Sequence, residues 1–206
     1  MAFEKYLVDY CSPTLASVKT ANLFNWFYES HTELWEQLSY WNLLMNPKGV
    51  YLYVLREHPK KALIYVCRKK RLEENLKRPE ITAFLSAYGY RDLNVETAIE
   101  RLKSRFATGE AFPHEIGVFL DYPLGDVVGF IENGGRNYKC SGCWKVYCDE
   151  CESRKLFAMY QKCRDIYRRL YEEGRSVFQL TVAVKHMKSI VAVTTGNSYN
   201  IKKKEV

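Results

Sequence analysis

Two apolar runs separated by a short polar turn constrain the fold more than any other feature of the sequence. Residues 50–56 and 62–68 are rich in β-branched and aromatic side chains, and the turn between them contains Pro59. Such runs are typical of the two strands of a β-hairpin. We therefore expect a small antiparallel sheet built on this hairpin.

Helical signals flank the hairpin on both sides. Residues 30–33 read Ser-His-Thr-Glu, which fits a capping box, and apolar residues then recur at helical spacing from Leu34 to Met45. Amphipathic helices are also predicted over about residues 94–108 and over residues 153–173. Shorter helices are expected over residues 3–10, 72–76 and 79–88.

Two further elements complete the expected fold. Ser12 and Pro13 indicate a helix start, since Ser can cap a helix and Pro is tolerated at its first position. Residues 144–147 read Trp-Lys-Val-Tyr and predict a later strand, which we place in the sheet with the hairpin. The expected fold class is α+β, with a small antiparallel sheet (the hairpin plus a later strand) covered by five or more helices.

The chain of 206 residues is long enough to form one domain with its own core. We expect a single α+β domain over residues 1–184 and a basic, flexible tail over residues 185–206. This tail contributes part of the net charge of +7. A basic balance can favour nucleic acid or an anionic membrane surface, but we interpret it here as solubility plus a solvated tail.

The sequence also indicates a compartment. The N-terminal residues lack the basic and apolar regions of a secretory signal, and nowhere do about eighteen apolar residues run together. We therefore expect a cytoplasmic protein with no membrane span. In that compartment the seven cysteines would be kept as thiols or metal ligands rather than as disulfides.

Four of the cysteines are clustered. Cys140 and Cys143 form one C-x-x-C pair, and Cys148 and Cys151 form another. Four thiolates can hold a zinc ion or an iron–sulfur cluster. The strand predicted over residues 144–147 opposes this, because an extended chain at roughly 3.3 Å per residue would separate Cys143 from Cys148 by about 16 Å.

Two other interpretations of the cysteines stay open. Cys148 and Cys151 lie at the start of a predicted helix, where the helix dipole favours a thiolate and hence a redox dithiol. The acidic residues Asp149, Glu150 and Glu152 oppose a thiolate there. The remaining interpretation is that the thiols have no shared task.

Four residues are candidates for ligand binding: Lys19, His114, Glu115 and Lys145. A His beside a carboxylate can act as a general base or metal ligand, but adjacent helical residues point about 100° apart, so His114 and Glu115 do not face each other. A lone Lys beside a helix start, such as Lys19, is expected to be solvated. We predict that these four side chains converge on one ligand surface, and no motif among them assigns a reaction.

Two patterns that suggest nucleic-acid binding are weak. Residues 115–131 resemble a short helix-turn-helix, but its second helix would present Asp126 and Glu132 and no Lys or Arg. Base reading and phosphate contacts need such donors, so DNA is not an expected partner. Residues 68–71 are four consecutive basic residues, which we interpret as a solvated helix entrance rather than a phosphate patch.

Two blocks of the sequence carry a resemblance to a known family. The central block contains HEIGVFL at 114–120, YPL at 122–124, DVVGFI at 126–131 and WKVY at 144–147. The N-terminal block contains CSPTLA at 11–16, Lys19, and NLF at 22–24. Together they resemble a bacterial domain-of-unknown-function family, number 3793, found mostly in anaerobic Firmicutes, over roughly residues 6–183.

The sequence departs from the family pattern at two places. Asp121 stands where a Gly is usual, and the thiols of Cys143, Cys148 and Cys151 exceed those of the pattern. The resemblance implies no particular activity, cofactor or catalytic residue. Our first hypothesis is a non-catalytic ligand-binding or regulatory module of anaerobic metabolism, and the alternative is a thiol-based redox or metal protein that uses the C-x-x-C pairs.

The C-terminal region carries a second, shorter resemblance. Residues 190–198 resemble the strand and phosphate loop that open a flavodoxin. Only eight residues follow Ser198, so we expect no flavin-binding domain there. Genes of the resembled family can lie near flavodoxin genes, which makes an electron-transfer protein a candidate partner.

Overall fold

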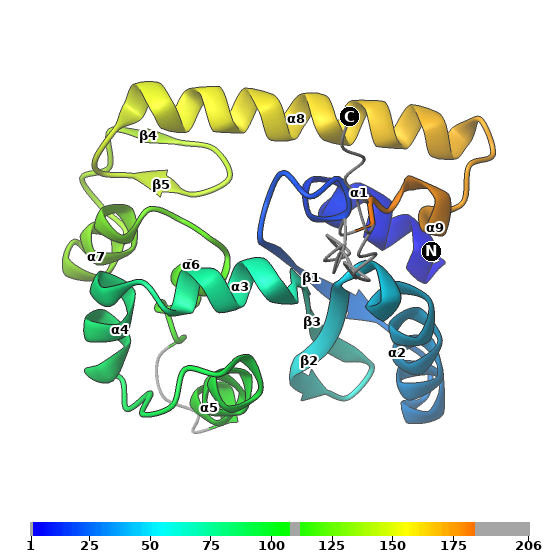
Figure 1. The fold of residues 1–206 in the computed structure, drawn as a ribbon, viewed down its shortest axis with the longest axis horizontal. Helices are drawn as coiled ribbons and strands as arrows, with labels where there is room; N and C mark the ends of the chain where they lie inside the picture. The colour runs from blue at the N-terminus through cyan, green and yellow to red at the C-terminus, as the bar shows by residue number, and fades with distance from the viewer. Residues whose placement is uncertain (1, 108–111, 184–206) are drawn as a thin grey trace, which may run out of the picture.

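A three-stranded antiparallel sheet organises the fold, which we describe from a computed structural model of residues 2–107 and 112–183 (Figure 1). The strands are β1 (Ala21–Phe27), β2 (Val50–His58) and β3 (Lys61–Arg68), in the order β1–β3–β2. The predicted hairpin is confirmed as β2 and β3, with Val50 opposite Arg68. The two strands pair through their backbone hydrogen-bonding groups, and β3 is buried along most of its length.

The central strand β3 divides its side chains between two apolar cores. Ile64 and Val66 point to one face, against α1 (Phe3–Leu15) and α2 (His31–Met45). Tyr65 and Cys67 point to the other face, against α3 (Lys69–Leu76), α4 (Pro79–Ser86) and α5 (Val95–Ala107). Successive strand residues point to opposite faces, so one apolar strand supports both cores.

The third strand of this sheet differs from our expectation. It is β1, whereas residues 144–147 contribute only the two-residue strand β5 (Lys145–Val146). This short strand pairs with β4 (Cys140–Ser141) in a separate two-stranded sheet. Strand β1 supplies seven residues of pairing to β3, which two residues cannot match. The fold class itself, α+β, is confirmed.

The predicted helix start at Ser12 and Pro13 is wrong, because α1 runs through both residues to Leu15. The apolar stripe Leu7, Cys11 and Leu15 continues across them at a spacing of four and is fully buried. Pro13 lacks an N–H and so forfeits one helical hydrogen bond. Its carbonyl oxygen accepts from the amides of both Val18 and Lys19, at 2.9 and 3.0 Å, which ends the helix.

The other long helices begin close to where the sequence predicts. Ser30 caps α2 by accepting from the Glu33 amide at 3.1 Å, and the Glu33 carboxylate accepts from the Glu29 amide at 2.8 Å. Helix α8 (Glu150–Glu172) begins three residues before the predicted position because Asp149 caps it. It runs along the molecule beside α1 and the β4–β5 hairpin (Figure 1). The remaining elements are η1 (Asn46–Lys48), α6 (Ile116–Phe119), α7 (Leu124–Glu132) and α9 (Val177–Leu180).

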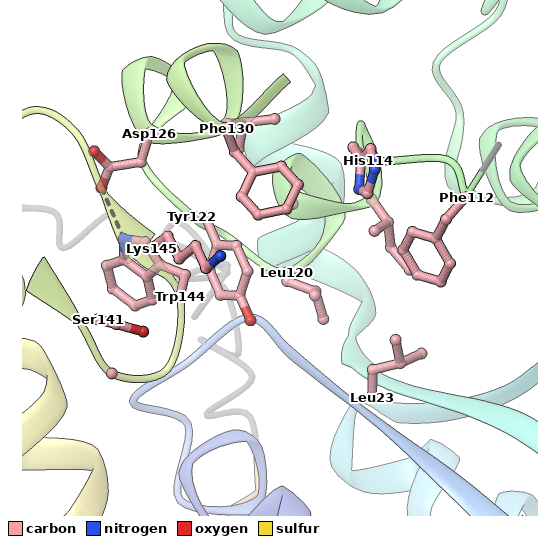
Figure 2. A pocket seen from close by; sticks show the side chains of 14 residues that line it. Leu23, Phe112, His114, Leu120, Tyr122, Asp126, Phe130, Ser141, Trp144 and Lys145 are labelled. Carbon is pink, nitrogen blue, oxygen red and sulfur yellow. Dashed lines mark hydrogen bonds between the residues drawn. The ribbon is translucent and has the colours of Figure 1, made fainter. Parts of the chain in front are cut away.

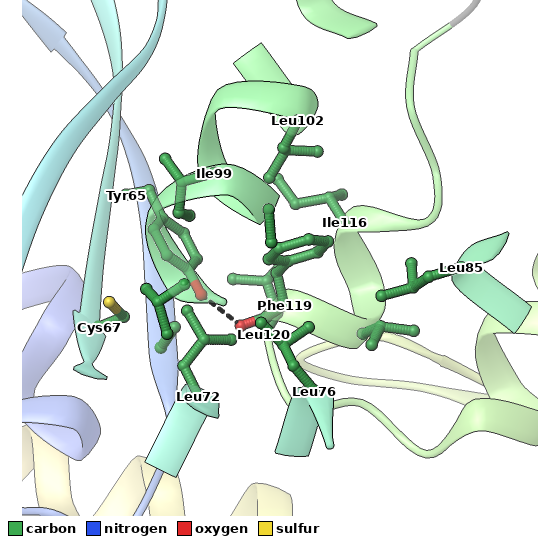
Figure 3. Close-up of a cluster of buried hydrophobic side chains, with 14 of the residues drawn as sticks. Tyr65, Cys67, Leu72, Leu76, Leu85, Ile99, Leu102, Ile116, Phe119 and Leu120 are labelled. Atoms are coloured by element: carbon green, nitrogen blue, oxygen red, sulfur yellow. Dashed lines mark hydrogen bonds between the residues drawn. The ribbon is translucent and has the colours of Figure 1, made fainter. Parts of the chain in front are cut away.

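Helix α6 lies between the sheet and residues 121–149. The Tyr65 hydroxyl donates to the Phe119 carbonyl at 2.6 Å inside the apolar core (Figure 3). The Asn75 side-chain amide donates to the Val118 carbonyl at 2.9 Å. Both bonds are to carbonyls of a four-residue helix that has few internal hydrogen bonds, and they fix α6 against β3 and α3.

Residues 121–149 form what we call the hairpin layer: α7, β4, β5 and their connections. Its own core is small, with Cys140, Trp144 and Val146 packed against Tyr160 of α8. The buried carboxylate of Asp126 ties the layer together. One oxygen accepts from the Trp144 indole N–H at 2.7 Å, and the other accepts from the backbone amides of Tyr147 and Cys148, each at 2.8 Å.

This burial corrects the helix-turn-helix interpretation. Helices α6 and α7 do form, but Asp126 is only 2% exposed and is not presented to solvent. Its negative charge lies near the start of α7, where the helix dipole favours it.

Asp121 begins the layer in the left-handed region, at φ +62°. Glycine adopts this conformation without strain, whereas a residue with a Cβ does not. The carboxylate of Asp121 accepts from the Thr20 hydroxyl at 2.5 Å and lies 3.9 Å from the Arg71 guanidinium.

Two predictions concern regions beyond this core. Among the residues described, no helix combines the length and the apolar character needed to cross a membrane. The tail predicted over residues 185–206, including the flavodoxin-like segment at 190–198, lies outside the described residues.

Candidate functional site

An apolar pocket of about 290 Å³ opens between α6, α7 and the β4–β5 hairpin. Figure 2 shows the aromatic rings of Tyr122, Phe130 and Trp144 around it, with Leu23 of β1 at its base. We call it the aromatic pocket. It draws residues from three separate stretches of the chain, namely Leu23, residues 112–130 and residues 141–145, so only the folded protein has it.

Close packing holds the aromatic walls in place. The Trp144 ring stacks on Tyr122 with centroids 4.8 Å apart and meets Phe157 of α8 edge to face at 4.5 Å. Asp126 fixes the indole through its N–H. At Gly142, any Cβ would lie 2.2 Å from the Phe157 ring, so the hairpin turn needs a glycine to approach α8.

Two predicted residues, His114 and Lys145, line this pocket. The ammonium of Lys145 donates to the Gly135 carbonyl at 2.7 Å and lies over the Tyr138 ring, 4.9 Å from its centroid. The His114 ring lies 4.8 Å from that of Phe130. The pocket therefore combines aromatic surface with one cation and one imidazole. Asp126 is the one carboxylate among the described lining residues, and its charge is already engaged by three N–H donors.

Glu115 does not line the aromatic pocket. It is 1% exposed and forms an ion pair with Arg105 of α5, with 2.9 Å between the guanidinium Nε and the carboxylate. Burial, together with the Glu115 charge, raises the pKa of nearby Tyr90, whose hydroxyl lies 3.5 Å from the same carboxylate. Glu115 thus links α5 to the start of α6. The predicted divergence of His114 and Glu115 fits this placement.

Lys19 lies in a second cavity of about 280 Å³, which adjoins the first and shares Leu23, Leu120 and Tyr122 with it. We call it the Lys19 cavity. The expectation that Lys19 is solvated is wrong, because it is 3% exposed. The chain folds back after α1 and carries Lys19 beneath α8, where its ammonium donates to the Ala21 carbonyl at 2.8 Å.

Burial is the main influence on the charge of Lys19. It lowers the pKa of the ammonium from 10.5 to about 8, while Cys143, Cys11 and Asp121 oppose the shift and Arg164 adds to it. The ammonium also lies over two aromatic rings, 5.0 Å from the Tyr122 centroid and 5.9 Å from that of Tyr160. These contacts stabilise a cation without neutralising it.

The four clustered cysteines occupy different surroundings. Cys140 is buried in the core of the hairpin layer, Cys143 is partly buried beside Lys19, and Cys148 and Cys151 are exposed. All are free thiols. Over residues 2–107 and 112–183, no three His, Cys, Asp or Glu side chains gather as a metal site.

The redox interpretation also lacks an activated thiol at Cys148. Burial and the neighbouring Asp126 raise the pKa of Cys148, which disfavours the thiolate that a redox dithiol needs.

Arg68 is an important residue that the sequence pattern misplaced. It is 2% exposed and donates to the backbone carbonyls of Thr14, Lys48 and Val182 at 2.7, 3.0 and 2.7 Å, and also to that of Leu15. Burial lowers its pKa to about 10. The last carbonyls of α1 need donors, and a side chain at the end of β3 reaches them. The basic run at residues 68–71 is therefore not a uniformly solvated helix entrance.

Tyr122, Trp144 and Tyr160 were missed as site residues. Their sequence context marks them as ordinary aromatic positions, and only the packing of the hairpin layer against α8 brings them around the two cavities.

Comparison with known proteins identifies the family but no activity. A family model described as "Protein of unknown function (DUF3793)" matches residues 7–181, which include both cavities and all the strands. No curated protein and no solved structure matches the chain. The chain therefore belongs to the DUF3793 family.

Proposed function

We propose that this protein is a non-catalytic ligand-binding or regulatory module that holds a small organic molecule in the aromatic pocket. The observation that carries the proposal is the composition of that pocket, in which aromatic and aliphatic walls surround a few polar groups. Pockets of this kind are the usual sites of small-molecule binding in proteins. A volume of about 290 Å³ suits a ligand smaller than most drugs.

The polar groups favour a particular ligand chemistry. An apolar ring can pack against the aromatic walls of the pocket, and the ammonium of Lys145 favours an anionic substituent. Asp126 adds little repulsion, because three N–H donors already engage its carboxylate. The proposed ligand is therefore a small aromatic or apolar anion.

The contacts in the pocket support binding rather than catalysis. Of the groups that could transfer a proton, His114 contacts the rings of Phe112 and Phe130, and Asp126 is held by donors of the hairpin. General acid–base catalysis needs a group within hydrogen-bond reach of a partner in the reaction. The described residues lining the pocket form no His–carboxylate pair.

We place this module in the cytoplasm, in anaerobic metabolism, with an electron-transfer protein as a candidate partner. The seven free thiols fit a reducing compartment. The alternative of a thiol or metal protein has less support, because the four cysteines lie in different surroundings. Metal analysis of protein purified without oxygen separates the two, since stoichiometric zinc or iron would favour the alternative.

Titration with the fluorescent aromatic sulfonate 1-anilinonaphthalene-8-sulfonate tests the aromatic pocket. We expect saturable binding at one site, because the probe has both an apolar ring system and an anionic group. Ser141→Trp, which places a large ring at the pocket, should weaken binding at least tenfold. The matched control is Ser104→Trp on the exposed surface of α5, which should bind like the wild type. Equal binding by the two variants, or no saturable binding at all, would contradict the proposal.

A further inference from the structure

We propose that the Lys19 cavity is a second and separate binding site, which takes a small anion of the phosphate or short-carboxylate type. Two cationic side chains, Lys19 and Arg164, line this cavity, and no Asp or Glu stands among its described lining residues. The hydroxyl of Tyr160 adds a hydrogen-bond donor, whereas that of Tyr122 already donates to the Cys143 carbonyl at 3.2 Å. A cavity with this lining is complementary to negative charge.

Lys19 is almost fully buried, with 3% of its surface exposed. A buried ammonium that lacks a counter-charge is costly. The ammonium has three N–H donors, and the partners found for it are one backbone carbonyl and two aromatic faces. A bound anion would supply the counter-charge that these neutral groups do not.

The carboxylate of Asp121 does not fill this role. Asp121 acts on Lys19 electrostatically, but it accepts a hydrogen bond from Thr20 and lies 3.9 Å from the Arg71 guanidinium. Its charge is therefore shared among several partners, and it does not line the cavity.

Arg164 supplies the second positive charge of the cavity. It reaches the cavity from α8, where one guanidinium nitrogen donates to the Gln161 side chain at 2.9 Å. A guanidinium has five N–H donors and binds phosphates and carboxylates well. Its positive charge lowers the pKa of Lys19, so the two cations repel each other across the cavity. An anion between them would convert this repulsion into attraction.

A purely structural role for Lys19 leads to a different expectation. Lys19 follows the end of α1, where the helix dipole favours a cation. That role would need Lys19 alone and would be indifferent to Arg164. The site proposed here needs both cations, so Arg164 is the residue that separates the two explanations.

Calorimetric titration of the full chain with inorganic phosphate and with succinate, at ionic strength matched with sodium chloride, tests the site. We expect one anion to bind at one site per chain, and which anion binds identifies the class. Arg164→Gln should weaken binding about tenfold or more, as expected for a lost charge-assisted hydrogen bond. The matched control, Arg154→Gln, removes an exposed Arg of the same helix and should stay within about twofold of the wild type.

Two further variants complete the experiment. Lys19→Met should abolish anion binding, and Ser141→Trp should retain it, so that a failure of the aromatic pocket is distinguished from a failure of this site. No saturable binding of either anion to the wild type would overturn the proposal. Unchanged affinity in Arg164→Gln would overturn it too, whether or not Lys19→Met folds.

Discussion

The sheet and the hairpin layer are held together by different means. The sheet is covered on both faces by large apolar cores, and its stability comes mainly from the burial of alternating strand residues. The hairpin layer has a four-residue core and depends on one buried carboxylate and on glycines that allow close approach. Both cavities lie between the hairpin layer and the sheet. The proposed binding surfaces therefore lie in the part of the molecule that is held by fewer stabilising contacts.

The largest expected effect lies in the sheet. Ile64→Ala should lower the free energy of unfolding by about 4 kcal/mol, because it leaves a cavity at a fully buried position of the central strand. Urea unfolding followed by far-ultraviolet circular dichroism measures this. Arg56→Ala, at an exposed position of β2, should change stability by less than about 0.5 kcal/mol. If both variants lose the same stability, the core described here is not what holds the sheet.

The next-largest effect is expected for Lys19, because burial disfavours the charged form of its side chain. Its pKa is about 8 in the folded protein and 10.5 ordinarily, so between these pH values the unfolded chain binds more protons and stability rises with pH. The penalty present below pH 8 should be relieved by pH 10.5. It amounts to about 3 kcal/mol from the size of the shift.

The measurement is the difference in unfolding free energy between the wild type and Lys19→Met at several pH values. This difference cancels the titration of buried tyrosines and cysteines, which both proteins share. From pH 8 to pH 10.5 the wild type should become more stable relative to Lys19→Met. A difference that stays flat over this window would show that Lys19 carries its ordinary pKa and is solvated.

A smaller and more local effect is expected at Asp126. Asp126→Asn keeps the side-chain size but turns an N–H donor toward one of the groups that now donate to the carboxylate, which should cost about 2 kcal/mol. Hydrogen exchange should accelerate at the amides of Tyr147 and Cys148 before it does in β3.

The matched control for that variant is Asp165→Asn on the exposed side of α8, where exchange in the hairpin layer should not change. Equal acceleration in β3 and in the hairpin layer would mean that the two regions open together. It would contradict the claim that they are stabilised by different means.

The smallest effect is expected at the junction of the two regions. Asp121→Gly removes a hydrogen bond with Thr20 but relieves the positive φ, so stability should stay within about 0.5 kcal/mol of the wild type. Asp121→Ala loses the bond without relief and should cost about 1 kcal/mol. Thermal unfolding of the two variants measures the contrast. Equal stability of the Gly and Ala variants would remove the role assigned to this backbone conformation.

The same comparison explains what the sequence could predict. The β2–β3 hairpin and the Ser30 cap of α2 rest on local patterns, and both are confirmed. The sheet position of residues 144–147 was wrong because strand pairing depends on partners distant in the chain. The burial of Lys19 and Arg68 was missed for a related reason, because it depends on tertiary packing: the Ala21 carbonyl of β1 accepts from Lys19, and carbonyls at the end of α1 accept from Arg68.

The candidate site could be predicted only in part. His114 and Lys145 were named and do line one pocket, while Lys19 lines its neighbour and Glu115 lies in an ion pair outside both. The aromatic walls could not be foreseen, because Tyr122 and Trp144 become neighbours through tertiary contacts: Asp126 holds the Trp144 indole, and the Tyr122 hydroxyl donates to the Cys143 carbonyl.

The central claim is that small molecules bind at the hairpin layer and not at the sheet. Amide nuclear magnetic resonance spectra of the full chain, recorded during titration with 1-anilinonaphthalene-8-sulfonate, test it most directly. The account predicts shifts of the Trp144 indole N–H and of the amides of Gly117 and Gly142, with the interior of β2 and β3 unchanged. Shifts centred on β2 and β3, with those three signals unmoved, would contradict it.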